Sequence, residues 1–531
     1  MSSPAPDDTR LDADQISTHS SYASSSDSSS RARRNKEKQA LRLIAFIAAN
    51  IIALACGSIV VFSLYAPLLQ SRLHYTQFQV NAVAIAGSVA LYLPISLIGY
   101  ICDRVGLKPL ALGGGILFGS GYGIAAGVYR KLDLEYHSHP GYRVNGDWSV
   151  PFLMFAFVCI GIATCALYMA SVSSCAKNFG KGRYRGLALA TPITCFGLSP
   201  MWLSQAGTRL FTETRPDGSK GDLDVFRFFL FLAILTFSMG MLGTFTLRVV
   251  DEDELIDEAI EELEQSGLLD GSSLLGRSER SYGATGDETE GSALLDPSKD
   301  DAKWKKNWVL NAETRSFLSD RTMWPFALAF LLIVGPGEAF INNLGTIIGT
   351  LTPPEMEGLS HRTSAATHVS IFGVTNTASR IFIAPHARSD VSNRFSISRV
   401  AFMAFFATLL SIGLLILASG LVQNHAERFW LVSVTIIWGV ENFATNFGII
   451  GMLPAAGSTF WGLVYSATYQ NGANNSKSAP GSEERADLFC YGEQCYAPTY
   501  WAETVTVWVA VGLLIWAWKG RGGWSQRGIV I

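Results

Sequence analysis

Long apolar runs constrain the fold of this chain more than any other feature of its sequence. A helix needs about 20 mainly apolar residues to cross a bilayer, and lipid-exposed backbone must be helical or closed into a barrel to satisfy its hydrogen bonds. The 531 residues are 49% hydrophobic and only 16% charged, whereas soluble domains have about 25% charged residues. The sequence therefore predicts an all-α membrane protein with twelve transmembrane helices. The predicted spans are residues 42–69, 79–102, 109–129, 151–176, 186–210, 225–247, 323–350, 365–385, 400–421, 429–452, 453–469 and 501–518.

These spans fall into two blocks of six, separated by an acidic, polar stretch over residues 248–322. Two similar blocks joined by a polar linker are typical of secondary transporters built from repeats. We therefore expect two pseudo-symmetric six-helix bundles, at residues 41–247 and 323–518. The polar, Ser-rich residues 1–40 are predicted to be a disordered cytoplasmic segment, and residues 519–531 a cytoplasmic tail.

Positive charge gathers on one side of the predicted membrane. Segments rich in Lys and Arg stand before the first span, in the loops after the second, fourth and eighth spans, and after the last span. Because such segments tend to stay in the cytoplasm, both termini are predicted to be cytoplasmic. The net charge of −3 hides an acidic central stretch and basic loop ends. It suggests no nucleic-acid partner, and membrane lipid is the expected surrounding.

The loop between the second and third predicted spans has a recognisable pattern. It reads Gly99-Tyr-Ile-Cys-Asp103-Arg104-Val-Gly106-Leu-Lys108. Gly106 permits a tight turn, and the two cations favour the cytoplasmic side. The pattern resembles the signature loop of the major facilitator superfamily, which lies between the second and third helices. The resemblance implies the major facilitator fold and assigns Gly99, Asp103, Arg104, Gly106 and Lys108 to a conformational latch between the two halves.

Two further segments resemble one branch of that superfamily. Residues 57–77 and 337–345 are similar to the nodulin-like group, which grades into the fungal monocarboxylate-transporter homologues. The resemblance implies a secondary active transporter that works by alternating access. Monocarboxylate carriers have an Asp four residues before an Arg in their eighth helix, whereas this chain has Asn376 before Arg380. The missing acid argues against proton-coupled transport of the lactate type.

Ionisable residues inside a span are costly and usually functional. The first of three in the second half, Glu338, follows Gly335-Pro336-Gly337, a sequence that predicts a break in the seventh span. Broken helices are found where they line a cavity. Asn342 lies four residues after Glu338 and therefore shares its helix face. Both residues are candidates for contacting a substrate or a coupling ion.

The other two are Arg380 in the eighth span and Glu441 in the tenth. Counted from the outer surface at about 1.5 Å per residue, they lie roughly 22 Å and 18 Å into their spans. This similar depth makes a pair plausible. In the tenth span Asn442 and Asn446 share another face, and Asn446 is a further candidate. Arg380 is the candidate anchor for an anionic or polar substrate. The alternative is a buried ion pair that only holds two helices together.

The last loop on the outer side contains two cysteines and one glycosylation sequence. Cys490 and Cys495 are predicted to form a disulfide, because an oxidising lumen favours the bond and no histidine stands near them. Asn474-Asn-Ser is the sequon of the chain, and Asn474 is therefore the predicted glycosylation site. No metal cluster, nucleotide loop or nucleophile triad is apparent, so we expect no cofactor, no metal site and no enzymatic activity.

The central polar stretch contains three acidic dileucine patterns. Such patterns resemble sorting signals that adaptors read at lysosome-like or vacuolar membranes. They predict a multi-pass protein of such a membrane, with sorting adaptors as partners. The leucines are Leu268, Leu269, Leu274, Leu275, Leu294 and Leu295. A disordered linker with incidental leucine pairs is the alternative.

Together these features favour a secondary active transporter of a small organic solute across an internal membrane, with an organic anion as one candidate. The substrate is expected between the two halves, near the middle of the membrane. A transporter-like nutrient sensor without net flux is the alternative, with the acidic linker as its signalling surface. A membrane-embedded enzyme is disfavoured because no His/Asp or Ser constellation accompanies the intramembrane charges.

Overall fold

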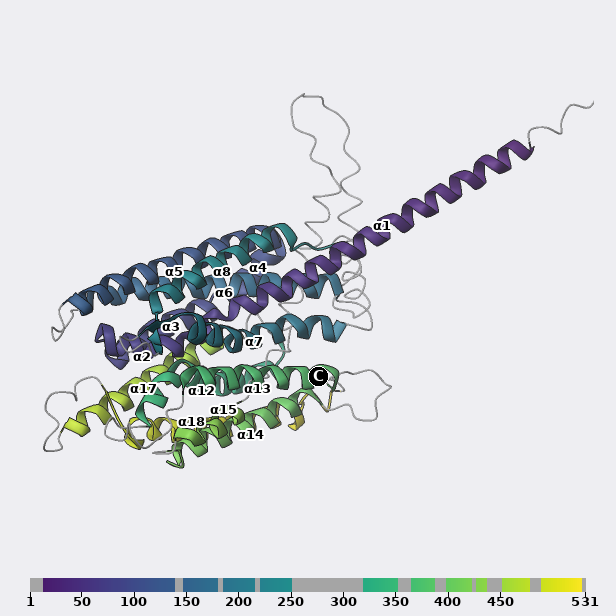
Figure 1. The fold of residues 1–531 in the computed structure, drawn as a ribbon. Helices are drawn as coiled ribbons and strands as arrows, with labels where there is room; N and C mark the ends of the chain where they lie inside the picture. The colour runs from purple at the N-terminus through teal and green to yellow at the C-terminus, as the bar shows by residue number, and fades with distance from the viewer. Residues whose placement is uncertain are drawn as a thin grey trace, which may run out of the picture.

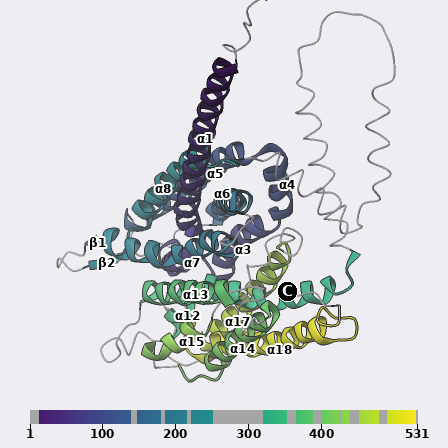
Figure 2. The same cartoon turned by 90° about the vertical axis from the view of Figure 1, so that its right-hand side faces the viewer.

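The computed structural model consists of two helical halves that lie side by side (Figure 1, Figure 2). It describes residues 13–138, 147–179, 185–214, 220–250, 319–351, 364–386, 398–422, 426–436, 451–477 and 489–527. In Figure 1 the N-terminal half, from purple to teal, stands above the C-terminal half, from green to yellow. The helices of both halves run roughly parallel to one long direction, as helices that share one membrane must.

The N-terminal half contains helices that match all six predicted spans. Its elements are α1 (Ala13–Cys56), η1 (Gly57–Val61), α2 (Phe62–Leu73), α3 (Gln77–Tyr92), α4 (Ile95–Val105), α5 (Leu107–Ser138), η2 (Asp147–Ser149), α6 (Val150–Phe179), α7 (Arg185–Leu210), β1 (Thr212–Thr214), β2 (Lys220–Leu223) and α8 (Val225–Thr246). The continuous unit α1–η1–α2 forms the first span, and α3 with α4 forms the second. The two short strands make an antiparallel hairpin.

The C-terminal half contains the helices of the other predicted spans. Its elements are α12 (Met323–Thr350), α13 (Ala365–His386), α14 (Arg399–Ala418), η5 (Ala426–Phe429), α15 (Trp430–Thr435), α17 (Leu453–Lys477), η7 (Glu493–Cys495) and α18 (Ala497–Lys519). The structure describes only the beginning of the tenth span, as α15. Within the described residues, eight segments are long and apolar enough to cross a membrane. The predicted all-helical membrane fold is confirmed.

The first helix extends further than the sequence predicts. Where a disordered segment was expected up to residue 40, α1 continues back to Ala13. No Pro or Gly interrupts the chain between Ala13 and Cys56, and extending an existing helix costs far less than nucleating one. The membrane-spanning part begins near Lys36. In Figure 1 the polar part of α1 extends well beyond the other helices.

The predicted break in the seventh span is wrong. Helix α12 runs without interruption from Met323 to Thr350, with Pro336 inside it. Gly335, before Pro336, serves packing instead. A Cβ atom on Gly335 would lie 2.9 Å from the backbone of Gly457 in α17. Gly335 therefore lets two helices of one half come into backbone contact.

Glycines have the same role in the N-terminal half. Gly115 of α5 lies against Gly240 of α8. A Cβ atom on Gly240 would lie 2.3 Å from the Cα atom of Gly115. Small residues allow such close approach where lipid supplies no hydrophobic force between helices.

The two ends of the molecule differ in their polar contacts. At the end that contains β1 and β2, called the hairpin end here, Arg72 donates two hydrogen bonds to Glu213, of 2.5 and 2.7 Å. Arg72 also lies 3.5 Å from Asp133 and 3.6 Å from Asp222. The hydrogen bonds from Arg72 lower the pKa of the Glu213 carboxyl below its ordinary value. This cluster joins the hairpin to α2 and α5. The opposite end, which contains Asp103, is called the latch end.

Candidate functional site

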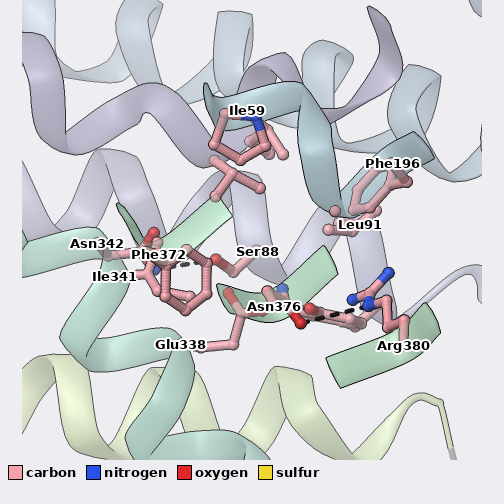
Figure 3. A pocket seen from close by; sticks show the side chains of 14 residues that line it. Ile59, Ser88, Leu91, Phe196, Glu338, Ile341, Asn342, Phe372, Asn376 and Arg380 are labelled. Carbon is pink, nitrogen blue, oxygen red and sulfur yellow. Dashed lines mark hydrogen bonds between the residues drawn. The ribbon is translucent and has the colours of Figure 1, made fainter. Parts of the chain in front are cut away.

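A cavity lies between the two halves, and both halves contribute to its wall (Figure 3). It contains about 570 Å³ of empty space, counting the part open to solvent. The lining residues come from η1, α3, α7, α12 and α13. They are Ile59, Val60, Ser88, Leu91, Tyr92, Phe196, Gly197, Pro200, Glu338, Ile341, Asn342, Phe372, Asn376 and Arg380.

Helices α3 and α12 place four polar side chains across the cavity from one another. Tyr92 donates a hydrogen bond to Glu338, and Asn342 donates one of 3.3 Å to Ser88. Ser88 and Tyr92 are four residues apart on α3, and Glu338 and Asn342 are four residues apart on α12, so each helix presents one polar face. Figure 3 shows Asn342 and Ser88 meeting above Glu338. The predicted shared face of Glu338 and Asn342 thus lines a cavity and touches the other half.

Arg380 occupies the other side of the cavity, on α13. It is 3% exposed and donates a 3.3 Å hydrogen bond to Asn376 one turn earlier. It also donates to the backbone carbonyl of Ile193 in α7. A Cβ atom on Gly197 would lie 3.3 Å from the guanidinium, so a larger residue there would crowd Arg380. The cation therefore both lines the cavity and bonds to the other half.

Glu338 and Arg380 give the cavity one acidic and one basic side. A buried guanidinium is suited to bind a carboxylate or another planar anion, while Glu338 can accept from a hydroxyl or an amine. The predicted partner Glu441 and the nearby Asn446 lie outside the described residues. The pair between Arg380 and Glu441 therefore stays a prediction.

Polar bonds between the halves close the molecule on the hairpin side of the cavity. Gln77 donates 2.9 Å to Asn343, and Gln70 donates 3.3 Å to Tyr469. Asn81 Nδ2 donates 2.7 Å to Ser466 and 3.2 Å to the carbonyl of Gly462. We call the set the hairpin-end seal. It consists of Gln70, Gln77, Asn81, Asn343, Ser466 and Tyr469.

At the latch end, Asp103 contacts its own half. Its carboxylate lies 2.7 Å from the ammonium of Lys177 in α6. Arg104 stacks on Tyr100 with 4.2 Å from its guanidinium to the ring centroid. Gly106 has φ = +100°, which is why glycine is needed at this turn.

The latch formed by Gly99, Asp103, Arg104, Gly106 and Lys108 stays a prediction, because residues 387–397 and 437–450 of the C-terminal half lie outside the described residues. Within the described residues, Asp103 ends α4 beside the end of α6, and the cation that it contacts belongs to that helix.

The pair between Asp103 and Lys177 should be measurable in a double-mutant cycle. Both side chains are partly exposed, at 31% and 25%, so their coupling should be about 0.2–1 kcal/mol. Thermal unfolding of purified Asp103→Asn, Lys177→Met and the double variant checks this. The control pairs Asp103→Asn with Arg104→Met, which should show no coupling. Coupling only in the control would contradict the assignment.

The last loop carries the predicted disulfide. Cys490 and Cys495 are bonded to each other, and the backbone amide of Cys490 donates to Tyr469 of the hairpin-end seal. The bond therefore lies directly behind the seal. Asn474 is exposed near the end of α17, at the same end of the molecule. Its glycosylation stays a prediction, and the six dileucine residues lie outside the described residues.

The sequence interpretation missed several polar residues at the interface between halves. Ser88 and Tyr92 are neutral residues in a span chosen for its apolar character, and Gln77 precedes the predicted start of that span. Glu503, in the last predicted span, was also not singled out, and it is fully buried in α18 of the C-terminal half. Their shared signal is polarity at helical spacing within apolar runs. That signal identifies a polar face of a helix, but it does not identify the residues that this face contacts.

Comparison with known proteins agrees with this architecture. The chain is 82% identical to "Probable transporter MCH1" of Gibberella zeae over 100% of both chains. It is 49% identical to "Probable transporter mch1" of Neurospora crassa, over 98% of this chain and 97% of the relative. With "Probable transporter MCH1" of Saccharomyces cerevisiae it shares 25% identity over 82% and 85% of the two chains.

Solved structures show the same fold at low sequence identity. The xylose transporter XylE of E. coli in a partially occluded inward open conformation matches with a TM-score of 0.57 at 12% identity, covering 90% of this chain and 98% of that one. The proton:xylose symporter XylE bound to 6-bromo-6-deoxy-D-glucose matches with a TM-score of 0.54 at 13% identity, covering 90% and 96%. The family model of the Major Facilitator Superfamily matches residues 46–471. The chain therefore belongs to the Major Facilitator Superfamily.

Proposed function

We propose that this protein is a secondary active transporter of a small organic solute with an anionic group. The observation that supports the proposal is the cavity between the halves, with Arg380 on one side and Glu338 on the other. A solute there touches both halves at once, so its binding can favour one arrangement of the halves over another. The guanidinium of Arg380 would bind the anionic group, and Glu338, Asn342 and Ser88 would orient the rest.

Alternating access follows from where the bonds between halves lie. In the described residues, the hairpin-end seal closes the region beyond the cavity with neutral hydrogen bonds. Neutral bonds of about 0.5–1.5 kcal/mol each can be broken and remade in a transport cycle. The pair between Asp103 and Lys177 would keep the N-terminal half rigid while it rotates. This arrangement fits rocking of two bundles around a central site.

We place the protein in a vacuolar or lysosome-like membrane, with the latch end and both termini in the cytoplasm. The charge pattern of the loops supports the orientation. The disulfide between Cys490 and Cys495 also supports it, because the bond lies at the hairpin end and would then face an oxidising lumen. The dileucine patterns of the central linker support the internal address, and sorting adaptors would be the partners that bind them.

Arg380→Met should abolish transport while leaving the fold intact. Methionine has a similar length and no charge, and a lost hydrogen bond to a charged group costs about 1.5–3 kcal/mol, or roughly tenfold or more in binding. The measurement compares the metabolite content of vacuoles from cells with the wild-type protein, without it, or with Arg380→Met. The variant should reproduce the deletion for one class of organic anions.

Arg380→Lys is the matched control, since it keeps the charge and loses the planar fork. It should give an intermediate metabolite profile. Gel filtration of fluorescent fusions verifies that each variant is folded. A wild-type profile in folded Arg380→Met would contradict the role of Arg380. An unchanged metabolite pool after deletion of the protein would contradict transport itself and would favour a sensor.

A further inference from the structure

Glu503 is a carboxyl group buried in α18 for which the proposed transport site has no use. Its exposed fraction is 0%. Neither carboxyl oxygen has a hydrogen-bond partner in the part of the chain that the structure describes. It is the seventh residue of α18, roughly 9 Å along the helix from its start at the hairpin end. A charged group in a membrane span without a partner is costly, so its presence calls for an explanation.

Among the described residues, no cationic side chain pairs with Glu503. Helix α18 packs against α12, α14, α17 and η7. The titratable groups that these elements and α18 bring to this level are tyrosines and one acid. They are Tyr465, Tyr469, Tyr496, Tyr500 and Glu493. Further along, α12 carries Glu338, which is bonded to Tyr92, and α14 carries Arg399 at its far end. The smallest cation that can neutralise Glu503 in this setting is a proton.

We propose that Glu503 is a proton-binding site that couples transport to the proton concentration at the hairpin end. The site takes up one proton on a carboxylate oxygen and releases it to the same compartment or, after the halves move, to the other one. The tyrosines around it supply hydroxyl groups and no fixed charge, so the protonation state of Glu503 sets the charge of this region. This inference rests on the proposed transport function.

A short chain of contacts connects Glu503 with the hairpin-end seal. Tyr500 lies one turn before Glu503 on the same helix, and its ring centroid is 6.3 Å from that of Tyr465 in α17. The ring of Tyr465 is in turn 6.1 Å from that of Tyr469, whose hydroxyl accepts from Gln70 of the other half. A deprotonated Glu503 would need a water molecule or a hydrogen-bond donor beside it, and making room for that group would loosen this packing. Protonation should therefore favour the closed seal.

Infrared difference spectroscopy of the purified full-length protein tests proton binding directly, without a known substrate. Spectra are recorded as the pH is stepped from acid to neutral, in water and in deuterium oxide. The carbonyl stretch of a protonated carboxylic acid should appear at acid pH, disappear at higher pH and be absent in Glu503→Gln. The matched control is Glu493→Gln, which should keep the band.

The coupling is tested with cysteines at two positions that face each other in the seal, Asn81→Cys and Ser466→Cys. At neutral pH, disulfide cross-linking of this pair should be weaker than in the same pair combined with Glu503→Gln, because glutamine is neutral at every pH and keeps the seal closed. At acid pH the two should cross-link equally. Equal pH dependence with and without Glu503→Gln would overturn the coupling.

Two infrared results would overturn the proton site itself. One is a Glu503 band that persists at every pH at which the protein is folded, which would mean a permanently neutral core residue. The other is no Glu503 band at any pH. Neither readout requires flux, so a protein that binds a proton at Glu503 yet leaves the vacuolar metabolite pool unchanged would contradict the transport proposal alone.

Discussion

Replacing Gly345 by alanine should open the hairpin end of the protein without unfolding it. A Cβ atom at this position of α12 would lie 2.0 Å from the backbone carbonyl of Ser63, and 3.0 Å from the ring of Pro67, both in α2 of the other half. No side-chain rotation removes a clash with backbone. The halves must therefore move apart at this point, which breaks the neighbouring seal bond between Gln77 and Asn343.

Cross-linking between Asn81→Cys and Ser466→Cys measures this opening. A closed state that is destabilised by more than about 1.4 kcal/mol loses at least tenfold in relative population, and cross-linking should fall accordingly. Transport should fall with it, because one of the two required states is no longer reached. The thermal unfolding temperature should change little, since each half retains its own packing.

Gly349→Ala is the matched control on the same helix. A Cβ atom there meets nothing within 4 Å, and alanine is the better helix former by about 1 kcal/mol. Cross-linking in this variant should equal that of the parent pair. Undiminished cross-linking in Gly345→Ala would show that the halves do not meet at this glycine in the membrane.

Gly161→Ala should instead reduce the amount of folded protein. Gly161 lies in α6, where a Cβ atom would be 2.3 Å from the carbonyl oxygen of Gly87 and 2.9 Å from the backbone nitrogen of Leu91 in α3. Both helices belong to the N-terminal half, so no rocking motion relieves the clash. Overpacking in a close-packed core costs about 1–3 kcal/mol and sometimes more, and contact with rigid backbone favours the upper part of this range.

The measurement is thermal unfolding in detergent together with the yield of monodisperse protein. Gly123→Ala in α5 is the control, because its Cβ atom meets nothing within 4 Å. The control should be as stable as the wild type or slightly more stable. Equal stability of the two variants would mean that α3 and α6 are farther apart than the structure shows. The contrast with Gly345 separates packing within a half from contact between halves.

The sequence alone determined the class of this protein and much of its plan. In lipid, an apolar run of bilayer length satisfies its backbone hydrogen bonds mainly by forming a helix. The number, order and approximate bounds of the spans therefore follow from hydropathy. The turn at Gly106 and the charges beside it likewise follow from local chemistry. These features depend on single segments, and a single segment can be interpreted without knowing its neighbours.

The partners of each polar side chain were decided only by the tertiary structure. Glu338 was identified as important, but its bond to Tyr92 depends on how α12 crosses α3. The contact of Asp103 with Lys177 depends on how the end of α4 lies beside α6. The Gly-Pro-Gly segment was interpreted as a break, whereas Gly335 packs on Gly457 inside a continuous helix. The local sequence around a glycine or a carboxyl group looks the same whether the residue breaks a helix, packs against another helix or binds a partner. The distance to another helix selects among them, and that distance is a property of the whole packed fold.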